Sequence, residues 1–334
     1  MNEGERVPSL KSQLVLVPLS QSFKALHCQL VKLQIANSKM EIRSIRQATP
    51  YHRDLAVSKS LLRNMDMLSE SGGGIIEALN ATVHGNGTRT LVLSHGFGFD
   101  QSVWHYLIPY LACYFKVVVF DLIFVNPNLY DPKKYSNFDS YAQDLVCLLD
   151  QLNVKKTIYL GHSMSAMIGC IAATKRPDLF EHLILLGGSP RYLNAEGYYG
   201  GFERSDIDKI FEAINENFPV WVQNFVPMAV GINNSAAIAE FEYSLGRMKP
   251  EIVLSVAKTV FLSDLRLVLP QVKVPCTIIQ SREDIVAPTF IACYMKENLG
   301  DDATVKILET QGHFPQLTAF PLLLDALNQV LSIP

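Results

Sequence analysis

Short, uninterrupted apolar runs recur along this chain of 334 residues from about position 90 to the C-terminus. Runs of this length without alternation are typical of strands that are buried on both faces of a parallel sheet. They predict strands at Thr90–His95, Lys116–Leu122, Thr157–Gly161, His182–Leu186, Cys276–Gln280 and Val305–Leu308.

Patterns of helical period lie between several of these runs. Apolar side chains share one helix face at Tyr141, Leu145, Leu148, Leu149 and Leu152. Strands alternating with helices predict an α/β fold with a mostly parallel sheet flanked by helices. Over residues 189–270 the strand pattern stops, and helical stretches such as Ser205–Asn215 and Ser235–Arg247 replace it. This insertion predicts a helical cap over the carboxyl edge of the sheet, where open sheets form their sites.

Residues 1–74 differ in character from the rest of the chain. Their apolar side chains are scattered, the segment contains ten basic and six acidic side chains, and it ends in Ser71-Gly72-Gly73-Gly74. Glycine and serine runs of this kind are typical of linkers. The early acids Glu3 and Glu5 argue against a signal or transit peptide. We expect residues 1–74 to be a disordered extension or sequence outside the functional protein, and residues 75–334 to form the folded domain.

Composition excludes several classes of protein. Hydrophobic residues make up 49% of the chain and charged residues 18%, which is enough to bury a large core. A net charge of −3 disfavours a general nucleic-acid binder, and no apolar stretch reaches the length of a membrane span. The six cysteines are widely spaced without a C-x-x-C pair, which predicts reduced, mostly buried thiols of an intracellular protein. We therefore expect a cytoplasmic location, with the nucleus also open.

A candidate nucleophile lies in Gly161-His162-Ser163-Met164-Ser165, between a predicted strand and a helix-like stretch. A strand, a sharp turn and a helix form the context of a nucleophile elbow, with Ser163 at its apex. Glycine usually takes the last position of this motif, and Ser165 is still small enough to let the helix approach the strand. The alternative is that Ser163 only caps the following helix.

A serine becomes a nucleophile when a histidine removes its proton and an acid orients that histidine. Where this elbow occurs, the chain order is Ser, acid, His. Asp284 follows a predicted strand, and His313 is the only histidine after it. Both are therefore expected at the same sheet edge as Ser163. Glu283 remains an alternative acid, and a plain turn histidine remains an alternative role for His313.

Acyl transfer also needs backbone donors for the oxyanion, each typically worth about 3 kcal/mol. The amide of Met164 follows the nucleophile, and the loop Ser94-His95-Gly96-Phe97-Gly98 offers the amide of Phe97. The glycines of that loop could instead serve only a turn. His95 and His162 precede Ser163 in the chain, so we expect supporting roles for them.

At these motifs the sequence resembles the strigolactone and karrikin receptor hydrolases of plants. The resemblance extends over roughly residues 77–331 and is carried by Ser94–Gly98, Asp100–Trp104, Gly161–Gly169, Ser189–Asn194, Gly200–Glu203 and Gly312–Pro315. It implies an α/β-hydrolase fold with a four-helix cap, the triad Ser163, Asp284 and His313, and butenolide lactones as ligands. Met164 and Phe314 replace the smaller or different apolar residues of the receptors, which makes the chain most similar to the less characterised third branch of the family.

The resemblance also implies a ligand pocket and partners. The implied pocket residues are Phe97, His162, Tyr192, Phe202, Trp221, Phe225 and Phe261. Without the family, the cap aromatics among them could simply form cap core. The receptors use an F-box protein and a repressor as partners, and no metal or other cofactor is expected.

Three functions remain open from the sequence. The first is a serine hydrolase of a small ester or butenolide lactone. The second is a signalling receptor with little turnover that recruits an F-box protein. The third is a catalytically silent binding module, which the intact Ser163, Asp284 and His313 disfavour.

Overall fold

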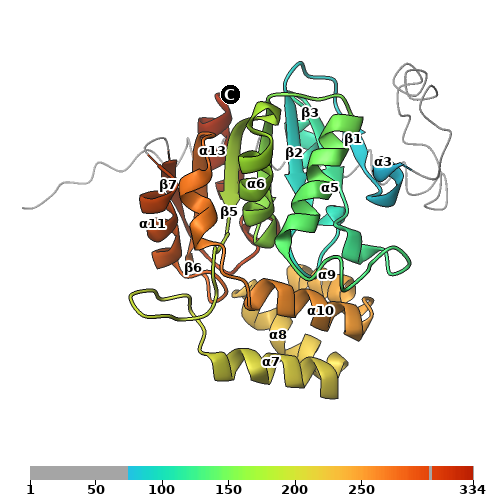
Figure 1. Ribbon diagram of the computed structural model, residues 1–334, viewed down its shortest axis with the longest axis vertical. Coiled ribbons are helices and arrows are strands. Elements are labelled where there is room, and N and C mark those ends of the chain that lie inside the picture. Colours follow the sequence, from blue (N-terminus) through green and yellow to red (C-terminus); the bar gives the residue numbers. More distant parts are fainter. Residues whose placement is uncertain (1–73, 301–302, 334) are drawn as a thin grey trace, which may run out of the picture. The chain divides into compact units, whose positions relative to one another are not determined.

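A computed structural model describes residues 74–300 and 303–333 of the chain. The expected N-terminal extension, residues 1–74, lies outside the described residues except for Gly74. Within the described part, seven strands form one sheet in the order β1-β3-β2-β4-β5-β6-β7. All neighbouring strands are parallel except β1 and β3 (Figure 1).

The strands are β1 (Thr82–His84), β2 (Thr90–Ser94), β3 (Lys116–Phe120), β4 (Thr157–His162), β5 (Phe180–Leu186), β6 (Cys276–Glu283) and β7 (Ala303–Gln311). The six predicted strands and the α/β architecture are confirmed. Strand β1 escaped prediction because it is three half-buried residues long and carries no apolar run. In the centre of the sheet, Ser94 of β2 pairs with Gly161 of β4. This register brings the ends of the two strands, and the loops that follow them, to the same level.

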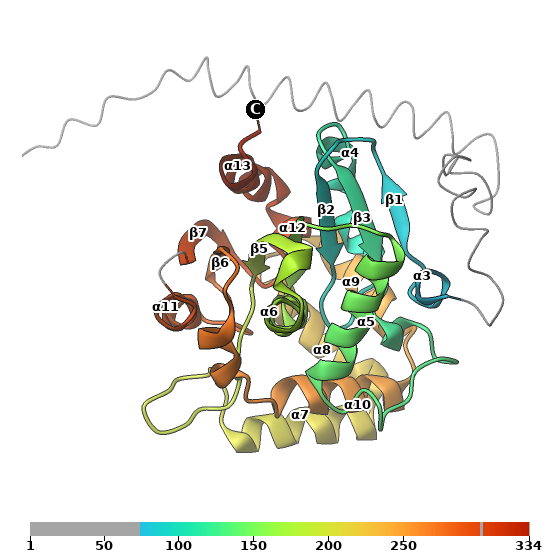
Figure 2. The same ribbon diagram turned by 45° about the horizontal axis from the view of Figure 1, so that its top comes forward.

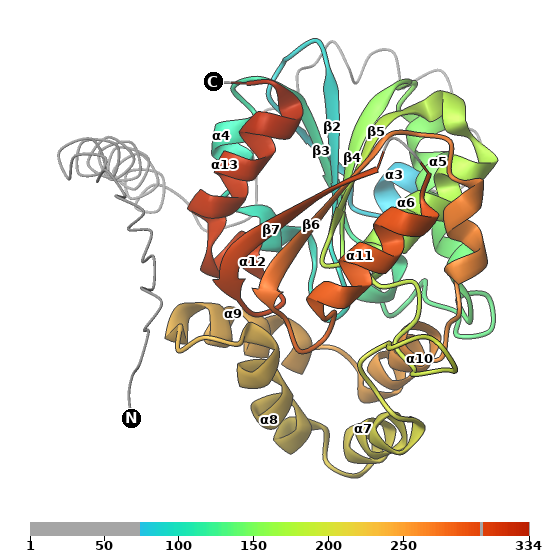
Figure 3. The ribbon, with the colours of Figure 1, turned by 90° about the vertical axis from the view of Figure 1, so that its left-hand side faces the viewer.

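Helices cover both faces of the sheet. Figure 3 shows α5 (Phe138–Gln151), α6 (Met164–Lys175) and α11 (Thr289–Asn298) on one face, and α4 (Ile108–Leu111) and α13 (Phe320–Leu331) on the other. The shorter helices are α3 (Ile75–Ala78), α12 (Pro315–Thr318), and the 3₁₀ segments η1 (Gln101–Trp104), η2 (Ile123–Val125), η3 (Pro177–Leu179) and η4 (Arg266–Gln271). Helix α5 buries Tyr141, Leu145, Leu148 and Leu149 of the predicted apolar stripe, whereas Leu152 follows the helix and is half-buried. The side chain of Asn137 caps α5 by accepting from the Asp139 amide.

Four further helices lie between β5 and β6 and gather at the carboxyl end of the strands (Figures 1 and 2). We call them the cap helices: α7 (Arg204–Glu216), α8 (Phe218–Val230), α9 (Ser235–Gly246) and α10 (Pro250–Phe261). The Asn217 and Asn234 side chains cap α8 and α9 by accepting from backbone amides. Gly231 follows the last residue of α8, and its positive φ of 75° is the left-handed conformation common after a helix.

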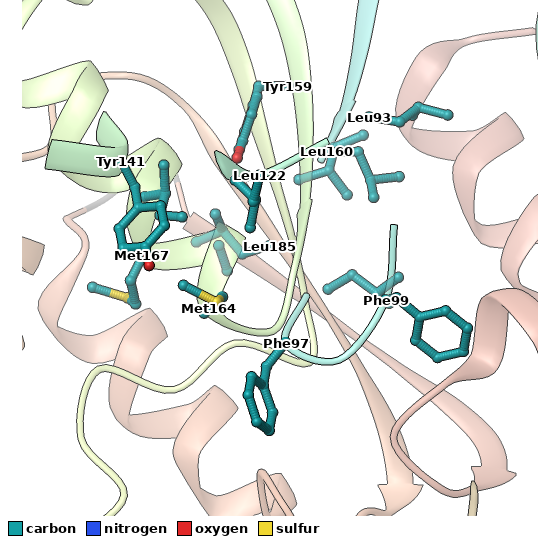
Figure 4. Close-up of a cluster of buried hydrophobic side chains, with 14 of the residues drawn as sticks. Leu93, Phe97, Phe99, Leu122, Tyr141, Tyr159, Leu160, Met164, Met167 and Leu185 are labelled. Atoms are coloured by element: carbon teal, nitrogen blue, oxygen red, sulfur yellow. The ribbon is translucent and has the colours of Figure 1, made fainter. Parts of the chain in front are cut away.

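The buried core runs from the strands to the carboxyl edge of the sheet, where Figure 4 shows Phe97 and Met164 beneath Leu160. The expectation of mostly buried cysteines was wrong. Of the five cysteines in the described residues, Cys113, Cys147 and Cys293 are exposed. Cys147 sits in an apolar run, but helical periodicity turns this one position of α5 outward between its buried neighbours. No helix among the described residues is long and apolar enough to cross a membrane.

Candidate active site

Ser163 stands at a sharp turn between β4 and α6. Its φ of 56° and ψ of −122° are unfavourable for a residue with a side chain, at a typical cost of about 1–3 kcal/mol. The turn is held because the Ser163 amide donates to the Leu186 carbonyl oxygen over 2.8 Å. A Cβ on Gly161 would collide with the backbone of Ser165. The glycine therefore permits the close passage of strand and helix that an elbow needs.

Ser165 occupies the position where such elbows usually carry glycine. Its hydroxyl donates to the carbonyl oxygen of His95 over 2.5 Å and accepts from the Ser94 hydroxyl over 2.9 Å. Both bonds are fully buried, so the serine satisfies its polar atom inside the core. The departure from glycine thus ties the elbow to the loop after β2.

His313 lies within hydrogen-bonding distance of both Ser163 and Asp284, and all three residues of the expected triad are buried. Nε2 of His313 is 2.9 Å from Oγ of Ser163, and Nδ1 of His313 is 2.7 Å from Oδ2 of Asp284. The other carboxylate oxygen of Asp284 accepts from the amides of Val286 and Ala287 over 2.8 and 3.1 Å. These bonds fix the carboxylate so that it can hold the imidazole in one orientation.

The two candidate acids have different surroundings. Glu283 is exposed, and its carboxylate accepts from the side chain of Gln311 over 2.7 Å. The structure therefore brings Asp284 to His313 and leaves Glu283 at the surface. Sequence reasoning missed Gln280, whose buried amide donates to Asp284 over 3.1 Å and to the Ala287 carbonyl over 2.7 Å. The available signal was a glutamine at the end of the predicted apolar strand Cys276–Gln280.

The hydrogen-bond partners of His95 and His162 determine which ring nitrogen carries the proton. The Leu122 amide donates to Nε2 of His95, so Nδ1 carries the proton and donates to the Gly96 carbonyl over 2.9 Å. Nε2 of His162 donates to the backbone carbonyl of His313 over 2.8 Å. Burial lowers the pKa of His95, and burial together with the adjacent His313 holds the pKa of His162 well below its ordinary value. Both rings are therefore neutral supports.

Of the two amides expected to bind an oxyanion, that of Phe97 lies in the loop after β2 and that of Met164 begins helix α6, directly after Ser163. The Phe97 amide donates to no backbone acceptor outside helices and strands among the described residues. Met164 is the first residue of α6, where an amide has no acceptor within the helix. A Cβ on Gly96 would lie 2.9 Å from Cβ of Ser163 and 2.8 Å from Nδ1 of His162. Only glycine lets this loop pass so close to the nucleophile.

A small cavity of about 20 Å³ opens in front of Ser163 and His313. Its aromatic lining consists of Phe97, Tyr192, Phe225, Phe241, Phe261 and Phe314, with Val260 and Val286 beside them. Of the expected pocket residues, Phe97, Tyr192, Phe225 and Phe261 line this cavity. Sequence reasoning missed Phe241, Phe314 and the two valines as wall residues, because their approach depends on the packing of the cap helices.

The other three expected pocket residues stand behind this lining. Phe202 packs edge-on against Phe261 with ring centroids 5.7 Å apart, and Trp221 stacks on Phe225 at 4.9 Å. His162 lies beneath, next to His313. A larger groove of about 480 Å³, between the start of α5 and the end of α10, contains none of the triad residues.

Comparison with known proteins agrees with this geometry. The family model described as the alpha/beta hydrolase fold matches residues 89–227. A strigolactone esterase of Arabidopsis thaliana is 47% identical over 260 residues, which cover 77% of this chain and 97% of the relative. A karrikin insensitive 2 receptor of Petunia hybrida is 44% identical over 269 residues, covering 78% of this chain and 100% of the relative.

Solved structures show the same architecture. A hydrolase from Oleispira antarctica is similar with a TM-score of 0.75 and 29% identity, over 77% of this chain and 96% of that one. Fold and site together define a serine-type α/β hydrolase. The chain belongs to the α/β-hydrolase family that includes the strigolactone esterases and the karrikin insensitive receptors.

Proposed function

We propose that this protein hydrolyses a small ester or butenolide lactone with Ser163 as nucleophile. The observation that carries the proposal is the buried hydrogen-bonded series from Ser163 through His313 to Asp284, opening on an apolar cavity. A nucleophile, a base and an orienting acid in this arrangement perform acyl transfer.

In the proposed reaction, Oγ of Ser163 attacks the carbonyl carbon while Nε2 of His313 takes its proton. Asp284 stabilises the imidazolium, and the amides of Phe97 and Met164 bind the oxyanion. Collapse of the intermediate expels the alcohol oxygen, which receives the proton from His313 and leaves an acyl group on Ser163. Water activated by His313 then releases the acid and restores the enzyme.

The wall of the cavity supports a flat, apolar substrate. Six aromatic rings line it, and its polar side chains are those of Ser163, His313 and Tyr192. Burial raises the pKa of Tyr192, which keeps that hydroxyl protonated. The names of the relatives point to butenolides of the strigolactone or karrikin type. We propose that the cap helices, over about residues 189–270, form the lid of this site.

A signalling receptor with little turnover is the second candidate. The His313 amide donates to the Ala229 carbonyl at the end of α8, so the proposed base is bonded to a cap helix. A reaction at His313 can therefore affect the cap helices through this hydrogen bond. The relatives named as receptors also favour a signalling role. In that case an F-box protein and a repressor are the proposed partners, and the cytoplasm and nucleus the proposed locations.

The test is exposure of the wild type and Ser163→Ala to excess of a synthetic butenolide analogue, with product quantification and intact-protein mass spectrometry. We expect many turnovers by the wild type and less than about one hundredth of that rate in the variant. If each protein molecule instead consumed one ligand and remained covalently modified, the receptor function would be supported. No product and no adduct with folded wild-type protein would contradict hydrolysis and leave a binding module.

A further inference from the structure

A groove separate from the Ser163 cavity lies between the core and the cap. Its volume of about 480 Å³ falls within the roughly 300–1,000 Å³ that is usual for small-molecule pockets. One wall belongs to the core, within residues 132–139, and the other to α10 and the segment after it, within residues 255–265. Figures 1 and 2 show the start of α5 next to α10. The groove therefore has the size of a ligand site and contains no residue of the proposed triad.

Two hydrogen bonds between the walls fix the width of the groove. The Thr259 hydroxyl, on α10, donates to the carbonyl oxygen of Tyr135 over 3.1 Å. The hydroxyls of Ser255, also on α10, and Tyr130 are hydrogen-bonded over 2.9 Å. Small-molecule sites are usually formed largely before the ligand arrives, and these bonds give the groove such a preformed shape.

Both walls contribute apolar surface to the groove. Pro132 and Phe138 belong to the core wall, and Leu262 and Leu265 to the cap wall. Phe138 is only 2% exposed, whereas Leu262 is 40% exposed. A ligand with an apolar body would cover this open leucine surface, and removing it from water favours binding.

The charged side chains of the groove leave one cation available. The carboxylate of Asp139 pairs with Lys175 over 2.8 Å, and that of Asp264 pairs with two arginines. Lys258, exposed on α10, forms no ion pair with any of the described residues, and its Nζ lies 5.9 Å from the centre of the Phe211 ring. Because the acids are already paired and Lys258 is not, the groove attracts a negatively charged group.

A second free donor faces Lys258 from the core wall. Oδ1 of Asn137 accepts from the Asp139 amide over 3.0 Å, so the side-chain NH₂ group is left to donate. It has no acceptor among the residues that the structure describes. The hydroxyl groups that line the groove already have partners in the protein. The polar groups left for a ligand are thus an ammonium and an amide NH₂, one on each wall.

We propose that this groove binds a small organic carboxylate with an apolar body. The carboxylate accepts hydrogen bonds from Lys258 and Asn137, a charge-assisted arrangement that suits an ammonium donor, and the apolar body lies against Phe138 and Leu262. A ligand in this position contacts the core and the cap at once and holds α10 against the start of α5. The site lies apart from Ser163 and does not depend on the proposed hydrolase function.

The first test compares two ligands that differ only in charge. The full chain is titrated calorimetrically with 4-phenylbutyrate and with its neutral amide, 4-phenylbutanamide. We expect the wild type to bind the carboxylate about threefold to fivefold more tightly than the amide, as for a partly exposed ion pair. Absence of carboxylate binding at millimolar concentration would overturn the inference, and so would equal affinity for the two compounds.

Lys258→Gln is expected to abolish the preference for the carboxylate, because the glutamine retains donors but carries no charge. Lys249→Gln is the matched control. It makes the same change of charge at the start of the same helix, and Lys249 is exposed and lies outside the groove. This variant should keep the preference within about 1.5-fold, since exposed charges beyond a Debye length are largely screened. A preference retained in Lys258→Gln, or lost equally in both variants, would contradict the proposed site.

Hydrogen–deuterium exchange locates the bound ligand. With 4-phenylbutyrate present, we expect slower amide exchange in both walls, within residues 132–139 and within residues 255–265, because the ligand holds them together. Lys258→Gln should show less of this protection at the same ligand concentration. Protection of one wall alone, or of neither, would refute the claim that the ligand ties the cap to the core.

Discussion

The backbone amide of His313 donates a 2.9 Å hydrogen bond to the carbonyl oxygen of Ala229, at the end of cap helix α8. Two glycines permit this approach. A Cβ on Gly231 would lie 2.6 Å from Cα of Gly312, and a Cβ on Gly312 would collide with the Val230 carbonyl. The loop that carries the proposed base is therefore fixed directly to the cap, backbone against backbone.

Gly231→Ala is expected to reduce both stability and activity. The residue has a φ of 75°, which costs an alanine about 1–2 kcal/mol, and the new methyl would press on Gly312 next to His313. We expect kcat/KM to fall by about tenfold or more, since small displacements of catalytic groups are costly. Thermal unfolding and ester hydrolysis measure the two effects.

Gly197→Ala is the control for backbone strain alone. Gly197 has a φ of 68°, and a Cβ there would have no atom within 4 Å. The free energy of unfolding of this variant should fall by about the same 1–2 kcal/mol of backbone strain, and its activity should not change. If Gly231→Ala retained wild-type kcat/KM, the contact between Gly231 and Gly312 would have no part in positioning His313.

The structure also separates the two candidate acids experimentally. Asp284→Asn should lower kcat by about 10⁴-fold, the loss measured for the corresponding change in a serine protease, because an amide no longer selects the productive imidazole tautomer. Glu283→Gln should change kcat by less than about twofold, since this side chain is exposed and bonded to Gln311. Steady-state kinetics on one ester decides between them. A larger loss from Glu283→Gln would reverse the assignment.

Stability should fall as the pH drops below about 6.5, the ordinary pKa of a histidine. His95 and His162 are buried with lowered pKa values, so between those values and 6.5 the unfolded state binds more protons than the folded state. The free energy of unfolding then decreases with falling pH, by up to about 1.4 kcal/mol per pH unit for each histidine. Urea unfolding at pH 7.5 and 5.5 measures this slope.

His162→Gln is expected to make that pH dependence shallower. Its amide can still donate to the His313 carbonyl, as Nε2 of His162 does, but it does not titrate. Equal stability of the wild type at the two pH values would contradict the buried neutral state of both histidines.

The residue pattern alone was sufficient for the strands, the elbow and the order of the triad. Apolar runs identify buried strands because parallel strands are covered on both faces. Gly161 and Ser165, small residues two positions before and after Ser163, mark the tight turn. Asp284 and His313 followed because parallel strands end at one edge of the sheet. These features are local, or depend only on the direction of the strands.

Tertiary packing decided which residues form the cavity wall and which side chains support the triad from behind. Phe241 and Phe314 reach the cavity beside Ser163 from segments far apart in the chain. Gln280 meets Asp284 only because the loop after β6 folds back. A phenylalanine in a cap helix has the same pattern whether it faces the substrate or only its neighbours. Which of the two occurs depends on how the cap helices pack on the sheet, and the periodicity of one segment contains no information about that packing.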